Sequence, residues 1–256
     1  MQDRTPIADA DMAELAGLLR AAQSGVVFTG AGISTESGIP DFRSPGGIWT
    51  KMMPVHYQDY ISDPEARRTS WARRFEMEET WNSVKPNAGH NAVAALVARG
   101  HVAHIVTQNI DNLHQASGVP EDKVIELHGN TGYAKCLTCG TRLEIAAIRK
   151  HFDAKGDAPD CALCGGIIKT ATISFGQAMP EAEMVRAGQA SLAADLFLVL
   201  GSSLSVYPAA SFPLLAKRAG AKLVILNRDE TEQDPYADLV IHGEIGSVLT
   251  EAIKDL

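Results

Sequence analysis

The stretch Val26-Val27-Phe28-Thr29-Gly30-Ala31-Gly32-Ile33-Ser34 decides the fold. Its first four residues are an apolar run typical of a buried strand, and Gly30-Ala31-Gly32 is typical of a tight turn. Such a turn lets backbone N–H groups approach a pyrophosphate and donate hydrogen bonds to it. The stretch lacks the full GxGxxG pattern, however, and a bare GxG is as often a plain tight turn. Both interpretations stay open on this stretch alone.

Helical and strand patterns alternate on both sides of this stretch. Helices are predicted at 8–22, 88–99, 181–193, 209–218 and 245–253, and strands at 26–29, 101–108, 124–127, 173–175, 196–200, 222–226 and 239–242. Strands that alternate with helices pair in parallel through right-handed crossovers. The sequence therefore predicts an α/β fold with a doubly wound, Rossmann-like parallel sheet.

All cysteines of the chain lie in two CxxC pairs, Cys136 with Cys139 and Cys161 with Cys164. Thiolates at this spacing can converge on one tetrahedral zinc ion. Two disulfides or four unrelated buried thiols are the alternatives, and a reducing cytoplasm disfavours the disulfides. No nearby His and Glu suggest an open catalytic position, so we expect a structural zinc.

Two segments interrupt the alternation of strands and helices. Residues 44–85 are rich in Pro, Gly, Trp and charged residues, which predicts short helices over a cleft. The cysteine pairs define the other segment. We therefore predict a large domain from 1–43, 86–130 and 171–256, and a small domain from the covering segment 44–85 and a zinc module 131–170.

The composition limits the classes of partner. The chain has 256 residues, 45% of them hydrophobic, and a net charge of −8. This acidic balance argues against direct binding of nucleic acid, whereas a basic peptide is electrostatically compatible. No signal peptide and no apolar run of about 20 residues is found, so we expect a cytoplasmic protein that does not bind membranes.

Polar residues follow several of the predicted strands. These clusters are Gly30 to Ser34, Gln108 to Asp111, Gly201 to Ser203, and Asn227. Ligands of open α/β sheets bind beyond the carboxyl ends of the strands, so we expect one site there.

A family resemblance rests on longer motifs. These are Gly30-Ala31-Gly32-Ile33-Ser34-Thr35-Glu36-Ser37-Gly38-Ile39-Pro40-Asp41-Phe42-Arg43, then Thr107-Gln108-Asn109-Ile110-Asp111-Asn112-Leu113-His114, Glu126-Leu127-His128-Gly129, the two CxxC pairs, Phe175-Gly176, Gly201-Ser202-Ser203-Leu204 and Asn227. With these motifs in this order, the chain resembles the sirtuins of bacterial type.

The resemblance implies an NAD-dependent protein lysine deacylase with NAD as co-substrate and a structural zinc. Acyl-lysine proteins or peptides would be its partners, and the products would be nicotinamide, free lysine and 2′-O-acyl-ADP-ribose. The implied catalytic residues are His128 as the general base, Asn109 and Asp111. The implied NAD-binding residues are Gly30, Ala31, Gly32, Thr35, Asp41, Phe42, Arg43, Gln108, Asn109, Ile110, Asp111, Gly201, Ser202, Ser203, Asn227, Glu244 and Ile245. The implied substrate-binding residues are Phe175, Gly176, Val206, Trp71 and Arg74.

Each of these residues also has an ordinary structural interpretation. Taken alone, His128 is more often a hydrogen-bonded structural histidine. Asn109 and Asp111 could cap the helix that follows them, which is compatible with ligand contact. Phe175 could be simple core, and we assign His114 to structure because it would lie a turn inside that helix.

Departures from the family pattern concern substrate choice. Gln177 stands where the family usually has Glu, and Thr170-Ala171 where it has Pro-Asp, so the peptide preference is open. Sirtuins that remove acidic acyl groups carry Tyr-x-x-Arg, whereas this chain has Trp71-Ala72-Arg73-Arg74. Arg74 could pair with a succinyl carboxylate, but Trp71 lacks the phenolic oxygen; alternatively, Trp71 packs and Arg74 is solvated. We predict removal of acetyl or short apolar acyl groups over removal of succinyl groups.

Other functions are weighed against this one. A protein mono-ADP-ribosyltransferase would share the NAD site, and a non-catalytic zinc-ribbon module would bind nucleic acid or protein. An NAD dehydrogenase usually needs GxGxxG and a later acidic residue, and neither is evident.

Overall fold

The computed structural model describes residues 7–41, 47 and 53–256. Its larger part is a six-stranded sheet with the order β3-β2-β1-β7-β8-β9, in which every neighbouring pair is parallel. The strands are β1 Gly25–Thr29, β2 Val102–Thr107, β3 Val124–Glu126, β7 Leu196–Leu200, β8 Lys222–Asn227 and β9 Leu239–His242. The predicted doubly wound sheet is therefore confirmed.

The strand order reverses between β1 and β7. The chain builds β1, β2 and β3 toward one edge, then returns to β7 beside β1 and builds β8 and β9 toward the other edge. Such a switch point leaves a crevice beyond the carboxyl ends of the two central strands, where α/β sheets bind ligands.

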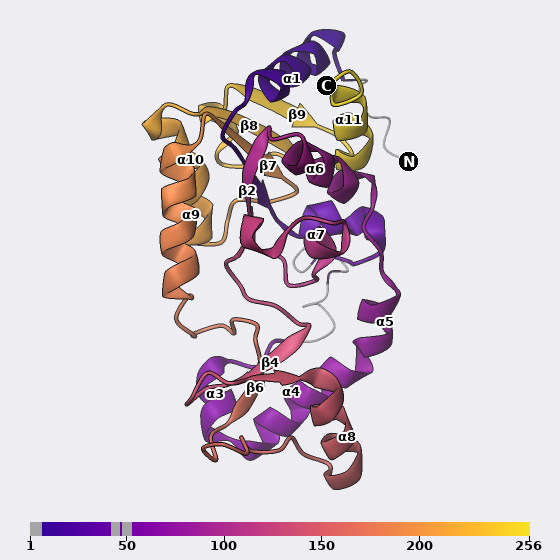
Figure 1. Ribbon diagram of the computed structural model, residues 1–256, viewed down its shortest axis with the longest axis vertical. Coiled ribbons are helices and arrows are strands. Elements are labelled where there is room, and N and C mark those ends of the chain that lie inside the picture. Colours follow the sequence, from indigo (N-terminus) through magenta and orange to yellow (C-terminus); the bar gives the residue numbers. More distant parts are fainter. Residues whose placement is uncertain (1–6, 42–46, 48–52) are drawn as a thin grey trace.

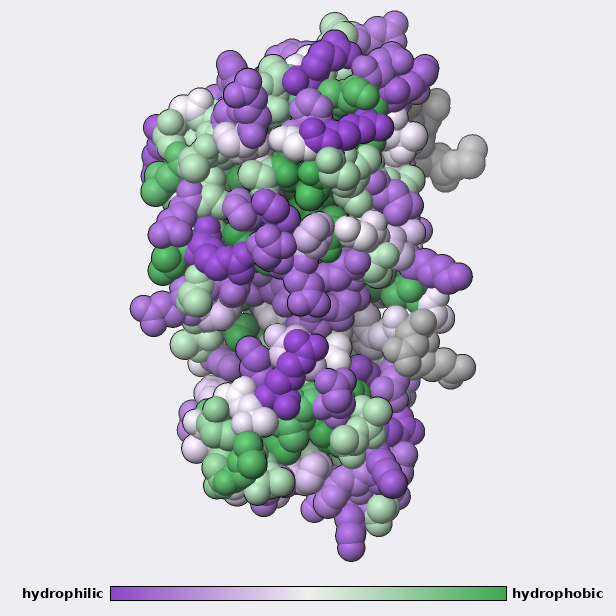
Figure 2. All heavy atoms as spheres, in the orientation of Figure 1, coloured by the Kyte–Doolittle hydropathy of each residue, from purple (hydrophilic) through white to green (hydrophobic). Residues whose placement is uncertain are grey.

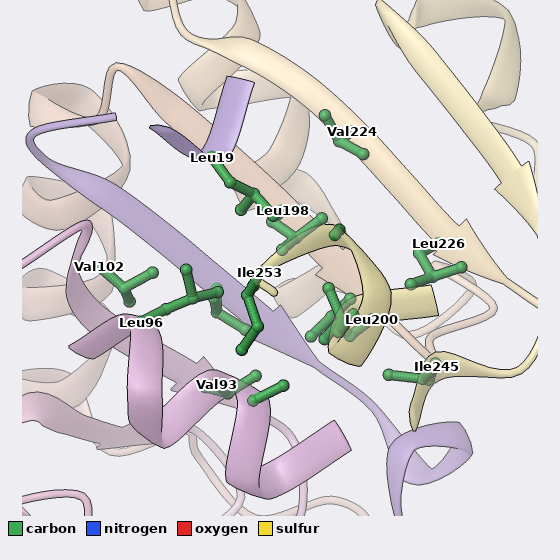
Figure 3. Packing of buried hydrophobic residues seen from close by; sticks show 14 of the residues in the cluster. Leu19, Val93, Leu96, Val102, Leu198, Leu200, Val224, Leu226, Ile245 and Ile253 are labelled. Atoms are coloured by element: carbon green, nitrogen blue, oxygen red, sulfur yellow. The ribbon is translucent and has the colours of Figure 1, made fainter. Parts of the chain in front are cut away.

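Helices cover both faces of the sheet (Figure 1). One face carries α1 Asp9–Ala21, α6 Ala88–Ala98 and α11 Ile245–Ala252, and the other carries α9 Glu181–Ala193 and α10 Phe212–Ala219. Successive residues of a strand point to opposite faces, so Val27 packs with the first group, and Val26 and Phe28 pack with the second. Figure 3 shows how Leu198 and Val224 of the sheet lie beneath the first group.

Short helices complete the large part of the molecule. They are η1 Ala31–Ser37, α7 Leu113–Ala116, η2 Glu121–Lys123, η3 Ala209–Ser211 and η4 Asp234–Tyr236. Within the described ranges, no helix combines the length and the apolar character needed to cross a bilayer.

A smaller part lies at the opposite end of the molecule (Figure 1). It contains the antiparallel sheet β5-β4-β6, whose strands are β4 Tyr133–Cys136, β5 Arg142–Glu144 and β6 Ile168–Thr170. The helices of this part are α3 Tyr57–Ser62, α4 Pro64–Glu76, α5 Glu78–Ser83 and α8 Ile145–Lys155. Trp71 and Phe75 of α4 share one buried cluster with Ala134, Ile148 and Ile168. The covering helices and the cysteine segment therefore form one core, although they are distant in sequence.

The strand predicted at 173–175 is wrong. These residues are irregular and belong to neither sheet; Ile173 N donates to His128 O at 2.8 Å. The segment lies just after β6 and leads back to the large sheet, so its apolar residues pack at a connection. Two apolar residues on either side of Ser174 do not distinguish a strand from such a connection.

Candidate active site

The glycine turn after β1 packs directly against the backbone that follows β7. Gly30 N donates to Leu200 O at 3.1 Å, and Gly32 N donates to Gly201 O at 2.8 Å. A Cβ atom on Gly30 or Gly32 would lie 2.6 or 2.7 Å from backbone atoms of Gly201. Gly201 itself has a φ of +63°, and a Cβ there would lie 2.4 Å from Ile33 N. Close packing of two backbones therefore explains these glycines, and two of the N–H groups of the turn are already bonded within the protein.

The side chains of Asn109 and Asp111 both form hydrogen bonds with the hydroxyl group of Ser34. Asn109 Nδ2 donates to Gly30 O at 3.0 Å and to Ser34 Oγ at 3.2 Å, and Ser34 Oγ donates to Asp111 Oδ2 at 2.7 Å. Burial raises the pKa of Asp111, although hydrogen bonds from Leu113 N and Ser34 Oγ oppose this rise. Asp111 Oδ1 accepts from Leu113 N at 3.0 Å, at the start of α7, so the capping role considered for Asp111 coexists with its place in the site.

Ser34 ends the first polar cluster predicted at the site, but the sequence analysis assigned it no role. Its side chain is buried and joins the two residues singled out after β2. A small polar residue two positions after the glycine turn was a signal for this position, but the identity of its partners required the fold.

His128 is held in one tautomer by a backbone carbonyl. Its Nδ1 lies 2.9 Å from Gln108 O, and a carbonyl oxygen only accepts, so Nδ1 carries the proton. Nε2 is then the nitrogen that carries the acceptor lone pair of the neutral ring. Gln108 is held in turn, because its N donates to Thr29 O at 3.0 Å and its Nε2 donates to Ser202 Oγ at 2.9 Å. The imidazole is thus fixed from the ends of β1 and β2.

The turn after His128 connects the two parts of the molecule. Gly129 has a φ of +73°, and a Cβ atom there would lie 1.9 Å from Ala171 O. Asn130 N donates to Ala171 O at 3.4 Å. Glycine is therefore required where the chain leaves His128 for the small part, because the segment that follows β6 passes directly against it.

Residues predicted to hold the second half of a dinucleotide line the ends of β7, β8 and β9. Ser202 and Asn227 are buried, and Ser203 Oγ lies 2.8 Å from Ser205 Oγ. Glu244 Oε2 lies 3.3 Å from Arg228 Nη2. Ile245 is buried at the start of α11. These residues lie beyond the same sheet edge as the glycine turn, which is the edge where a ligand of this fold binds.

The remaining residues that the resemblance implies are Thr35, Asp41, Phe42, Arg43 and Val206. Thr35 Oγ1 donates to Gly32 O at 2.8 Å, and Asp41 is half-buried. Phe42 and Arg43 lie outside the described residues. Val206 is half-buried in the segment between β7 and η3.

Phe175 is not a core residue. It is 40% exposed, and its ring lies 6.0 Å from the ring of His56. Tyr57 N donates to Phe175 O at 2.9 Å, so the start of the covering helices is fixed to this turn. Gly176 follows with a φ of +78°. On the face drawn in Figure 2, hydrophilic side chains form a band between the large sheet and the small part.

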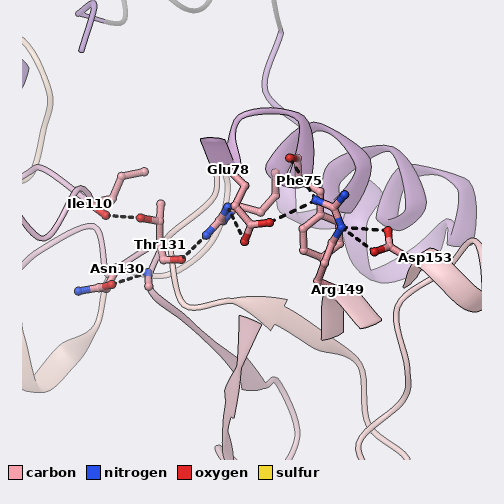
Figure 4. Close-up of polar contacts among 9 residues, drawn as sticks. Phe75, Glu78, Ile110, Asn130, Thr131, Arg149 and Asp153 are labelled. Carbon is pink, nitrogen blue, oxygen red and sulfur yellow. Dashed lines mark hydrogen bonds and ion pairs between the residues drawn. The ribbon is translucent and has the colours of Figure 1, made fainter. Parts of the chain in front are cut away.

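The side chains of Trp71 and Arg74 are both largely buried, but Trp71 packs against an aromatic ring and Arg74 has polar partners. Trp71 is 1% exposed and its ring stacks on Phe75 at 5.5 Å, so the packing alternative describes it in this structure. The Arg74 side chain is only 12% exposed, which makes the solvated alternative wrong. Arg74 Nη2 donates to Thr131 O at 3.3 Å, and Nη1 lies 3.9 Å from Glu78 Oε1 (Figure 4).

The four cysteine sulfurs form a compact cluster. All lie within 4.8 Å of one another, with Cys136 Sγ 3.5 Å from Cys164 Sγ and Cys139 Sγ 3.7 Å from Cys161 Sγ. A disulfide would need about 2.05 Å. Zn–S bonds of about 2.3 Å in a tetrahedron place the sulfurs roughly 3.8 Å apart, so the cluster fits zinc. Because all four ligands are thiols, the zinc is structural.

Removal of one zinc ligand should unfold the small part of the molecule. We expect Cys161→Ser to lose bound zinc and to abolish the cooperative melting of that part, because zinc binding supplies folding free energy. The measurements are zinc content by mass spectrometry and thermal unfolding by circular dichroism. Leu163→Ser is the matched control, since Leu163 lies in the same turn, is 76% exposed and is no ligand. One zinc per chain retained in Cys161→Ser would contradict the assignment.

Comparisons with known proteins agree over nearly the whole chain. The Sir2 family profile matches residues 30–208. The NAD-dependent protein deacetylase 1 of Bradyrhizobium diazoefficiens is 56% identical over 235 residues, which cover 92% of this chain and 92% of that protein. The NAD-dependent protein deacetylase of Rhodopseudomonas palustris is 52% identical over 244 residues, which cover 95% and 96%. A solved structure of Sir2 with a p53 peptide and NAD+ is 36% identical, with a TM-score of 0.82, and the match covers 95% of this chain and 98% of that one. The chain therefore belongs to the Sir2 family.

Proposed function

We propose that this chain is an NAD-dependent protein lysine deacetylase. It transfers the acyl group of a modified lysine to ADP-ribose and releases nicotinamide and 2′-O-acyl-ADP-ribose. The observation that carries the proposal is the fixed imidazole of His128, with Nδ1 at 2.9 Å from Gln108 O, at the sheet edge that holds Asn109 and Asp111. Relatives with the deacetylase name and the Sir2 structure with peptide and NAD+ support it.

His128 acts as the general base. Because Nδ1 carries the proton, Nε2 is the ring nitrogen that can accept one from a sugar hydroxyl of the co-substrate, and this makes the hydroxyl a better nucleophile. The carbonyl of Gln108 also prevents rotation of the ring and favours the imidazolium formed during proton transfer.

Asn109, Asp111 and Ser34 shape the pocket for the nicotinamide half of NAD. Their mutual hydrogen bonds fix the side chains before a ligand arrives, so little ordering is needed on binding. Ile110 lies between them in the chain and would contact the nicotinamide ring. Ser202, Ser203, Asn227 and Glu244 would hold the adenosine half, beyond the ends of β7, β8 and β9.

The acyl-lysine peptide enters between the large domain, 1–43, 86–130 and 171–256, and the small domain, 44–85 and 131–170. Phe175 lies on this boundary with 40% of its surface exposed, and Gly176 next to it leaves the backbone open for pairing with an extended peptide. A Sir2 structure with a propionylated peptide, 35% identical with a TM-score of 0.83, supports a peptide substrate.

Incubation with NAD and an acetyl-lysine peptide tests the function. We expect mass spectrometry to show nicotinamide, deacetylated peptide and acetyl-ADP-ribose in equal amounts. His128→Ala should reduce kcat by at least about a hundredfold, the scale of general-base catalysis, with its melting temperature unchanged. His151→Ala is the control, because His151 is a half-exposed residue of α8 far from the sheet edge. Full activity in His128→Ala would contradict the mechanism, and ADP-ribose added to protein without loss of acetyl would favour ADP-ribosyl transfer.

The small domain favours acetyl over succinyl groups. Glu78 lies beside the guanidinium of Arg74 and also 3.2 Å from Arg149 Nη1 (Figure 4). A succinyl carboxylate at Arg74 would meet the negative charge of Glu78, and the buried Trp71 offers it no hydroxyl. A neutral acyl group has no such repulsion.

The rates on acetyl-, butyryl- and succinyl-lysine forms of one peptide test this preference. We expect kcat/KM for acetyl to exceed that for succinyl by at least about tenfold, the effect of one unfavourable charge contact. Glu78→Gln should raise the succinyl rate relative to the acetyl rate, because it removes the competing carboxylate. Faster succinyl than acetyl cleavage by the unmodified chain would refute the preference.

A further inference from the structure

A chain of buried hydroxyls lies directly beneath Asn109. Thr107 Oγ1 accepts a hydrogen bond from Asn109 N at 3.0 Å and another from Thr29 Oγ1 at 2.7 Å. Thr29 and Thr107 are 0% and 3% exposed, so water cannot replace either bond. The backbone of Asn109 is therefore fixed by side chains at the ends of β1 and β2.

His114 continues this chain in a defined tautomer. Its Nε2 lies 3.0 Å from Thr29 Oγ1. Because Thr29 gives its single hydroxyl proton to Thr107, its oxygen accepts from His114, and the proton of His114 is on Nε2. Nδ1 of His114 is then an acceptor, and it is buried with no hydrogen-bond partner among the described residues.

His90 supplies the complementary group. Asn87 N donates to His90 Nδ1 at 3.4 Å, so the proton of His90 is on Nε2, and this nitrogen also has no hydrogen-bond partner in the described part of the chain. The rings of His90 and His114 lie 5.2 Å apart between centroids. A buried donor and a buried acceptor thus occupy neighbouring rings, a spacing that a small shift or one internal water can bridge.

Both rings are neutral near neutral pH. Burial lowers the pKa of His90 to about 4. Burial, together with His90, lowers the pKa of His114 to about 3. A neutral pair can keep the same tautomers throughout the working pH range.

On the other side of the ring contact, Asn87 leads back to the site. Asn87 Nδ2 donates to Ile33 O at 2.7 Å and to Ser37 Oγ at 3.0 Å, both in η1. Asn109 Nδ2 donates to Gly30 O, at the start of the same short helix. The start of η1 and the loop after β2 are therefore linked through these residues, by hydrogen bonds except at the contact between the rings of His90 and His114.

We propose that His114 is a positioning residue that acts through Thr29 and Thr107 on Asn109, and that His90 joins it to Asn87. We name Asn87, His90, His114, Thr29 and Thr107 the histidine relay. The inference rests on the proposed function and adds residues that set the geometry of its pocket. Loss of one member leaves buried polar groups unsatisfied and lets the Asn109 backbone shift, and a shift of about 1 Å can cost about a hundredfold in rate.

A double-mutant cycle tests the histidine relay. We expect Thr107→Val and His114→Leu each to lower kcat for deacetylation by at least about tenfold, with KM for the peptide within about threefold, because Asn109 acts on NAD. The double variant should have a kcat no lower than that of the slower single variant, because both substitutions interrupt the same set of contacts to Asn109. Thr107→Ser and His114→Gln keep a hydroxyl and an Nε donor, and should retain kcat within about threefold.

A matched control separates positioning from loss of stability. Ser191 Oγ is equally buried and donates to Ala187 O in α9, so Ser191→Ala should lower the melting temperature without changing kcat. Amide hydrogen exchange of Asn109 should accelerate in Thr107→Val and His114→Leu but not in Ser191→Ala. If His114→Leu does not fold, Thr29→Val takes its place in the cycle.

The outcomes are distinct. Additive losses in kcat, or folded single variants with unchanged kcat and unchanged exchange at Asn109, would overturn the histidine relay. An unmodified chain without deacetylation would instead overturn the proposed function. The exchange measurement would then still decide whether His114 holds the Asn109 backbone.

Discussion

The contact between two backbones at the switch point of the sheet is the constraint on which the site depends. Gly30 and Gly32 after β1 lie against Gly201 after β7 with no room for a Cβ atom. Because these two strand ends are so close, Gln108 at the end of β2 can reach Ser202 after β7. Asn109 reaches Gly30 O because β2 pairs with β1. The glycines act through packing more than through free N–H groups, since two of those groups already donate within the protein.

The second constraint is the connection between the domains. His128 lies one residue before Gly129, whose positive φ and contact with Ala171 O direct the chain into the small domain. Beyond it, Thr131 bonds to Ile110 O by both its N and its Oγ1, and accepts from Arg74 (Figure 4). The helix α4 is thereby connected, through Thr131, to the loop that carries Asn109 and Asp111.

The sequence predicted what depends on local pattern. Alternating strands and helices, glycines at a strand end and paired cysteines are signals that the chain carries without its fold. It could not show that 173–175 lies outside the sheet, because so short a pattern of two apolar residues around Ser174 occurs both in strands and in connections. It could not show the role of Ser34 or the buried environment of Arg74, because their partners, Asp111 and Thr131, are distant in sequence. His114 was assigned to structure, and its contact with Thr29 became visible only when β1 and α7 met.

The central claim is that one fixed imidazole serves the sugar of a bound dinucleotide. A crystal structure of the chain with NAD and an acetyl-lysine peptide tests it most directly. The account predicts His128 Nε2 within hydrogen-bond distance of a hydroxyl of the nicotinamide ribose, with Nδ1 still bonded to Gln108 O. An imidazole turned away from the ribose, or a dinucleotide bound elsewhere than beyond the ends of β1 and β7, would contradict it.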